Sequence, residues 1–103
     1  MKLLFVCTGN LDRIPTAEEL FKDKHETKSC GISLSAPVRL TKKLINWADK
    51  IFCMEELHKE VVLDMCPKAK DKAIVLGITD CYFRNDPKLK EELKEKVKKY
   101  LGE

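Results

Sequence analysis

Short apolar runs alternate along this chain with longer stretches in which apolar residues recur three or four positions apart. The runs are typical of strands buried on both faces, and the longer stretches are typical of amphipathic helices. We expect strands at residues 3–6, 28–34, 50–54 and 73–78. Because each strand is followed by a helix, the pattern predicts an α/β fold: one three-layer domain over residues 1–103, with a four-stranded parallel sheet and helices on both faces.

Four helix starts can be recognised from residues that favour a first turn. Pro15 is tolerated in a first helical turn, because it lacks the backbone N–H that would have no partner there, so it predicts the start of the first helix. Thr41 can cap the second helix, and a third helix begins near Glu55. Asp86 followed by Pro87 predicts the start of the last helix. The expected apolar faces are Ala17, Leu20 and Phe21 on the first helix, Leu44, Ile45, Trp47 and Ala48 on the second, Leu57, Val61 and Met65 on the third, and Leu89, Leu93, Val97 and Leu101 on the fourth.

Length and charge limit the classes of protein to which this chain can belong. Its 103 residues can bury one core. The net charge of +3, from 20 basic and 17 acidic residues, is too small to indicate a nucleic-acid partner. Because no apolar stretch is long enough to span a bilayer or to form a signal peptide, we expect a cytoplasmic protein with no membrane partner.

The cysteines and histidines show no pattern typical of a metal site. The five cysteines are odd in number and form no C-x-x-C pair, which is unfavourable for a zinc site or a disulfide framework. Cys53 lies in an apolar run and is expected to be an inert core thiol. His25 and His58 lack ligand spacing and are expected at the surface. We therefore expect neither a metal nor another cofactor.

Candidate chemistry begins where the first strand ends, at the edge of a parallel sheet where ligands bind. Residues 7–13 read Cys-Thr-Gly-Asn-Leu-Asp-Arg. Glycine and asparagine tolerate positive φ, so the chain can curl and turn successive N–H groups inward to bind an oxyanion, assisted by the N-terminus of the following helix. The predicted phosphate-binding residues are Thr8, Gly9, Asn10, Leu11, Asp12 and Arg13.

The two residues at the ends of this loop predict a reaction. A cysteine at a helix N-terminus beside an arginine favours the thiolate, so Cys7 is the candidate nucleophile. Arg13 can bind two phosphate oxygens with its planar guanidinium group. Attack of the thiolate on phosphorus would form a phosphocysteine intermediate. The loop therefore predicts a cysteine-dependent phosphomonoester hydrolase.

These residues also resemble a known family. Phe-Val-Cys-Thr-Gly-Asn at residues 5–10, Arg13 and Pro-Thr-Ala-Glu at residues 15–18 are similar to the signature of the low-molecular-weight protein tyrosine phosphatases, and patches at 40–54 and 80–83 extend the similarity. The resemblance implies a phosphotyrosine protein phosphatase I-like fold, with Cys7 as nucleophile and Arg13 binding phosphate and the transition state. It also implies a phosphotyrosine protein or aryl phosphate as substrate, and inorganic phosphate or another oxyanion as ligand.

The resemblance further implies a general acid in a late loop. Asp80 matches it best, although Cys81 stands where the family usually has proline. A positioned carboxylic acid can protonate the leaving group and then activate water. Tyr82 and Phe83 either flank an aryl phosphate or pack on the last helix. Asp86 is a second candidate for the acid, but we favour it as a helix N-cap.

Three departures from the family pattern affect the expected activity. Ile14 replaces a serine that donates a hydrogen bond to the thiolate, which predicts slower turnover. Asp12 replaces a second cysteine, and it either points outward, forms an ion pair with the loop arginine or weakens phosphate binding by repulsion. Cys81 is instead a candidate resolving thiol for the nucleophile. The compact segment at residues 31–41 predicts a more open site.

Three alternative functions stay open at this stage. A thiol-dependent arsenate reductase shares the fold and loop but needs two further thiols, for which Cys66 and Cys81 are available on either side of a strand. A non-catalytic phosphate-binding module is compatible with Ile14 and Asp12. A sugar phosphotransferase IIB phosphocarrier also places a cysteine after its first strand, but it lacks the Gly-Asn and Arg-x-Pro pattern.

Overall fold

A computed structural model describes residues 1–9, 13–78 and 86–102, with the backbone alone for residues 13–15. Its sheet contains four parallel strands, β1 (Lys2–Cys7), β2 (Glu26–Gly31), β3 (Lys50–Cys53) and β4 (Ala73–Val75), in the order β2-β1-β3-β4. The helices are α1 (Arg13–Phe21), α2 (Lys42–Trp47), α3 (Glu56–Met65) and α4 (Pro87–Leu101), with a short 3₁₀ helix at Pro67–Asp71. The predicted four-stranded parallel sheet is confirmed.

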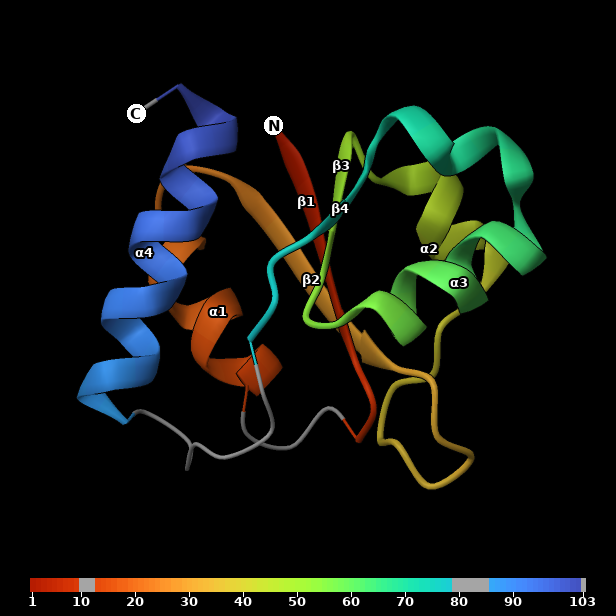
Figure 1. Cartoon of the computed structure of the whole chain (residues 1–103), viewed down its shortest axis with the longest axis horizontal. Helices are drawn as coiled ribbons and strands as arrows, with labels where there is room; N and C mark the ends of the chain where they lie inside the picture. The colour runs from red at the N-terminus through yellow and green to blue at the C-terminus, as the bar shows by residue number, and fades with distance from the viewer. Residues whose placement is uncertain (10–12, 79–85, 103) are drawn as a thin grey trace.

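Helices cover both faces of the sheet. Figure 1 shows α1 and α4 on one side and α2 and α3 on the other. Along the central strand β1, Leu3, Phe5 and Cys7 pack toward α1 and α4, while Leu4 and Val6 pack toward α2 and α3. All five are buried, because a central strand covered on both faces has no solvent side. This arrangement explains the unbroken apolar run from which the strand was predicted.

Two strands differ in extent from the prediction. β2 starts two residues earlier and ends three residues earlier than expected. Because it is an edge strand, it carries the exposed charged side chains of Glu26 and Lys28, and its apolar pattern is weak. β4 is shorter than expected, because Gly77 has a φ of 71° and leaves the extended conformation.

The face of α3 that packs on the sheet is not the predicted one. Leu57 is 44% exposed, and Val61 and Met65 are only partly buried. The fully buried residues of α3 are His58 and Val62. The expectation that His58 lies at the surface is therefore also wrong. The His58 imidazole can lie on this buried face because both of its ring nitrogens have hydrogen-bond partners in the interior.

The predicted helix caps are confirmed. Thr41 accepts a hydrogen bond from the Leu44 N–H over 3.2 Å, and the Asp86 carboxylate accepts one from the Lys88 N–H over 2.9 Å. The fully buried stripe of α4 consists of Leu89, Leu93 and Val97. Within residues 1–9, 13–78 and 86–102, no helix combines the length and apolar character needed to cross a membrane.

Candidate active site

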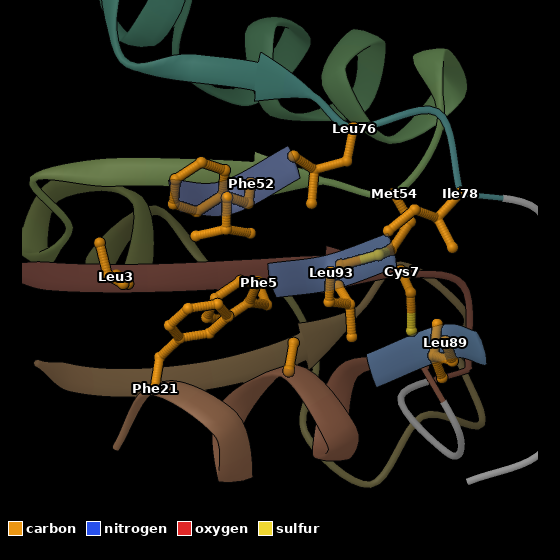
Figure 2. Packing of buried hydrophobic residues seen from close by; sticks show 12 residues of the cluster. Leu3, Phe5, Cys7, Phe21, Phe52, Met54, Leu76, Ile78, Leu89 and Leu93 are labelled. Atoms are coloured by element: carbon orange, nitrogen blue, oxygen red, sulfur yellow. The ribbon is translucent and has the colours of Figure 1, made fainter. Parts of the chain in front are cut away.

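Cys7 is the last residue of β1 and lies at the edge of the sheet where a ligand was expected. Its side chain is buried, with 2% of its surface exposed, in the apolar cluster on the α1 and α4 face. Figure 2 shows Cys7 at the same end of this cluster as Met54, Ile78 and Leu89. α1 begins at Arg13, two residues earlier than predicted. Strand, loop and helix therefore follow one another in the expected order.

The structure places only part of the predicted site. Thr8 and Gly9 are described in full, and Arg13 by its backbone. The other predicted site residues lie outside the described residues: Asn10, Leu11 and Asp12 in the loop, and Asp80, Cys81, Tyr82 and Phe83 in the late segment. The roles assigned to these side chains stay predictions.

Two other thiols lie on the strands that flank β1. Cys30 of β2 and Cys53 of β3 are both register partners of Val6, the residue before Cys7. Burial raises the pKa of each thiol to about 12, and negative charge at Cys7 adds to the rise at Cys30. Both thiols therefore stay protonated at neutral pH, and Cys53 lies in the core as expected.

α1 is fixed against the edge strand. The Ser29 hydroxyl donates to the Glu18 carboxylate over 2.6 Å, and Ala17 and Phe21 are buried beneath the helix. The N-terminus of α1 points toward the edge of the sheet where β1 ends, as Figure 1 shows. The unbonded N–H groups of a helix N-terminus carry partial positive charge, so this end of α1 favours an anion.

Thr8, the first residue after Cys7, is held by two separate parts of the protein. Its carbonyl oxygen accepts a hydrogen bond from the Ser33 N–H over 2.9 Å. Its hydroxyl oxygen lies 2.9 Å from Nε2 of His58 on α3. A Cβ atom at Gly31 would lie 2.5 Å from the Thr8 carbonyl oxygen, so this close approach requires glycine.

His58 is a buried polar residue beside the loop that sequence reasoning missed. Its side chain has no exposed surface, and its Nδ1 accepts a hydrogen bond from the Glu55 N–H over 2.9 Å. Glu55 precedes α3, and His58 is the third residue of the helix. A side chain at this position can reach back to the N-cap N–H, as in a capping box. The Glu-x-x-His spacing was the available signal.

Comparison with known proteins identifies the family. No protein-family model matches the chain. The protein-arginine-phosphatase of Geobacillus stearothermophilus is 32% identical to it, and the match covers 73% of this chain and 68% of that protein. The solution structure of a low molecular weight protein tyrosine phosphatase from Bacillus subtilis is similar, with a TM-score of 0.75 and 24% identity over 99% of this chain and 97% of that one. The chain belongs to the low-molecular-weight protein tyrosine phosphatase family.

This family member is a protein phosphatase that acts through a cysteine nucleophile, the class of activity that the loop predicted. The fold is shared with the tyrosine phosphatase Wzb from Escherichia coli K30, solved in complex with phosphate. That structure has a TM-score of 0.76 and 23% identity over 98% of this chain and 96% of Wzb. The expected three-layer α/β fold is thus confirmed both by its own topology and by its likeness to solved structures.

Proposed function

We propose that this phosphatase removes phosphoryl groups from protein side chains through Cys7. The Cys7 thiolate attacks phosphorus, so a P–S bond forms while the bond between phosphorus and the side-chain oxygen breaks. The observation that carries the proposal is the position of Cys7 at the carboxyl end of the buried strand β1, with the N-terminus of α1 at Arg13.

The loop and Arg13 bind the phosphoryl group in this proposal. Backbone N–H groups between Thr8 and Arg13 donate to its oxygens, and the Arg13 guanidinium binds two of them. The helix N-terminus adds partial positive charge where negative charge develops during the transfer. The two hydrogen bonds that hold Thr8 support this role, because donors aimed in advance need no reorganisation during the reaction.

Asp80 is the proposed general acid. It gives its proton to the departing oxygen, then takes a proton from the water that attacks phosphocysteine, releasing inorganic phosphate and the thiolate. Ile78, two positions before Asp80, packs in the same apolar cluster as Cys7, which supports this assignment. The competing carboxylate of Asp86 accepts a hydrogen bond from the Lys88 N–H at the start of α4.

Phosphotyrosine in a protein, or another aryl phosphate, is the proposed substrate, with Tyr82 and Phe83 beside the ring. Phosphoarginine is a second candidate, because the 32% identical relative is a protein-arginine-phosphatase. With that substrate a P–N bond would break, and Asp80 would protonate the guanidine nitrogen. The cytoplasmic location and the lack of nucleic-acid and membrane partners stay predictions from the sequence.

Steady-state hydrolysis of three phosphorylated probes tests the proposal. The probes are p-nitrophenyl phosphate, a phosphotyrosine peptide and a phosphoarginine-containing protein, each tested with wild type and Cys7→Ser. We expect Cys7→Ser to abolish all turnover and wild type to prefer the aryl phosphates in kcat/KM. A preference for phosphoarginine would select the second candidate. Equal activity of the two proteins would overturn Cys7 as the nucleophile.

A further inference from the structure

The contact between His58 and Thr8 joins a buried imidazole to the residue that follows the nucleophile. The imidazole has no exposed surface, and buried polar groups are costly unless they are hydrogen-bonded. Both ring nitrogens have partners: Nδ1 lies 2.9 Å from the Glu55 backbone nitrogen, and Nε2 lies 2.9 Å from the Thr8 hydroxyl oxygen.

The first of these contacts determines the direction of the second. A backbone N–H can only donate, so Nδ1 of His58 must accept from Glu55. A neutral imidazole then carries its proton on Nε2, which donates to the hydroxyl oxygen of Thr8. The cap of α3 thereby fixes both the tautomer and the orientation of the ring that holds Thr8.

We infer that His58 is a positioning residue for the phosphate-binding loop, an inference that rests on the proposed function. The Thr8 side chain is anchored to α3, and its carbonyl is anchored to the segment after β2 through Ser33. Two anchors on one residue restrict rotation of the backbone as it leaves Cys7. The anchored Thr8 carbonyl shares a planar peptide group with the Gly9 N–H, so the direction of this N–H is fixed as well. Small displacements of such donors are costly to catalysis.

Two conservative variants each remove one of the two hydrogen bonds of His58 and keep the other. The asparagine amide lies near the place of Nδ1, and the longer glutamine amide reaches the place of Nε2. His58→Asn should keep the bond to the Glu55 N–H and lose the donor to Thr8, whereas His58→Gln should do the reverse. A merely structural role would make activity follow stability, but a positioning role would make activity follow the Thr8 contact.

The readouts are kcat on p-nitrophenyl phosphate, affinity for inorganic phosphate and the urea midpoint. We expect His58→Asn to lose about tenfold in kcat and in phosphate affinity, with a smaller decrease of the urea midpoint than His58→Gln shows. His58→Gln should lose less than about threefold in both, with a lower midpoint. Full activity in His58→Asn together with a large loss in His58→Gln would overturn the inference.

A double-mutant cycle with Thr8→Val tests whether the two residues act as one unit. Valine keeps the shape of threonine without the hydroxyl, so Thr8→Val should match the loss in His58→Asn. The combined variant should lose no more than either single one. Fully additive losses would overturn the inference.

Comparison of wild type with Cys7→Ser distinguishes failure of the proposed function from failure of this inference. If wild type shows no Cys7-dependent turnover, the proposed function fails. The phosphate affinities of the His58 and Thr8 variants would then still decide the positioning role: unchanged affinities overturn it, and coupled losses support it.

Discussion

Gly31 and His58 both contact Thr8, although neither residue carries a catalytic group in the proposed reaction. Gly31 leaves room for the Thr8 carbonyl oxygen, and His58 binds the Thr8 hydroxyl. The sequence did not mark either residue as part of the site, because a glycine in a weak strand carries no signal of its own and the Glu-x-x-His spacing indicates only a helix cap. The parallel pairing of β1 with β2 places Gly31 beside the end of β1. The parallel pairing of β1 with β3 brings the start of α3, which carries His58, to the same edge of the sheet.

Replacing Gly31 with alanine should displace the start of the loop. The added Cβ would lie 2.5 Å from the Thr8 carbonyl oxygen and 2.8 Å from the Ala36 Cβ. We expect Gly31→Ala to lower the free energy of unfolding by about 1–3 kcal/mol and kcat by about tenfold or more. Urea unfolding and steady-state kinetics measure the two effects.

Gly102→Ala is the matched control for this substitution. Gly102 ends α4 with a φ of 74°, so alanine should cost about 1 kcal/mol there. Because the strain lies outside the candidate site, kcat should be unchanged. A wild-type kcat in Gly31→Ala would contradict the close approach described for Thr8.

The buried thiols of Cys30 and Cys53 should make stability depend on alkaline pH. Burial raises the pKa of each from 9.0 to about 12, so the folded protein binds these protons more tightly than the unfolded chain does. The protonated thiols therefore stabilise the folded protein. Their contribution to the free energy of unfolding is fully present below about pH 9 and is lost as the pH rises toward about 12. Urea unfolding of Cys53→Ala should show a shallower loss of stability between about pH 8 and pH 11 than wild type. Equal slopes would contradict the assignment.

Among the helices and strands, the residues that cap helices were predicted better than the lengths of strands or the buried faces of helices. Thr41 and Asp86 cap their helices as expected, because capping depends on a few neighbouring residues. The extent of β2 was missed because an edge strand tolerates charged side chains. The face of α3 was missed because the pattern of apolar residues gave no weight to a buried histidine.

The orientation of α3 predicts that replacing the smaller of two apolar side chains, Val62, costs more stability than replacing the larger one, Leu57. Val62 is fully buried, so Val62→Ala should cost about 1.5 kcal/mol or more. Leu57 is 44% exposed, so Leu57→Ala should change stability by less than about 0.5 kcal/mol, although it removes more carbon. Thermal or urea unfolding of the two variants measures the difference. A larger loss of stability in Leu57→Ala than in Val62→Ala would instead support the buried face of α3 that was predicted from the sequence.

Substitutions of Asp86 and Asp80 distinguish the two candidates for the general acid. Asp86→Ala should remove the cap and cost about 1 kcal/mol of stability, with kcat unchanged, because its carboxylate is bound to the Lys88 N–H. Asp80→Ala should lower kcat by about 100-fold or more, with stability changed by less than about 0.5 kcal/mol. Kinetics and urea unfolding of both variants provide the test. A large loss of kcat in Asp86→Ala, together with an unchanged kcat in Asp80→Ala, would identify Asp86 as the general acid.

At the scale of the whole molecule, the sequence predicted the layers and the edge of the sheet that carries Cys7. Unbroken apolar runs identified parallel strands covered on both faces, and the order of elements placed the loop at their carboxyl ends. Strand order was beyond prediction, because pairing of β1 with both β2 and β3 depends on contacts distant in sequence. The contact between Thr8 and His58 could not be predicted for the same reason, because the two residues are 50 positions apart in the sequence.

Trapping the covalent intermediate would show directly whether Cys7 is the nucleophile. The single variant Asp80→Asn, which slows hydrolysis of the intermediate, and the double variant Cys7→Ser/Asp80→Asn would be mixed with p-nitrophenyl phosphate and quenched rapidly. Peptide mass spectrometry would then locate the phosphoryl group. We expect one phosphoryl group on Cys7 in the protein that keeps this cysteine, and no turnover in the protein that carries Cys7→Ser. Release of phosphate by both proteins, with Cys7 unmodified throughout, would contradict it.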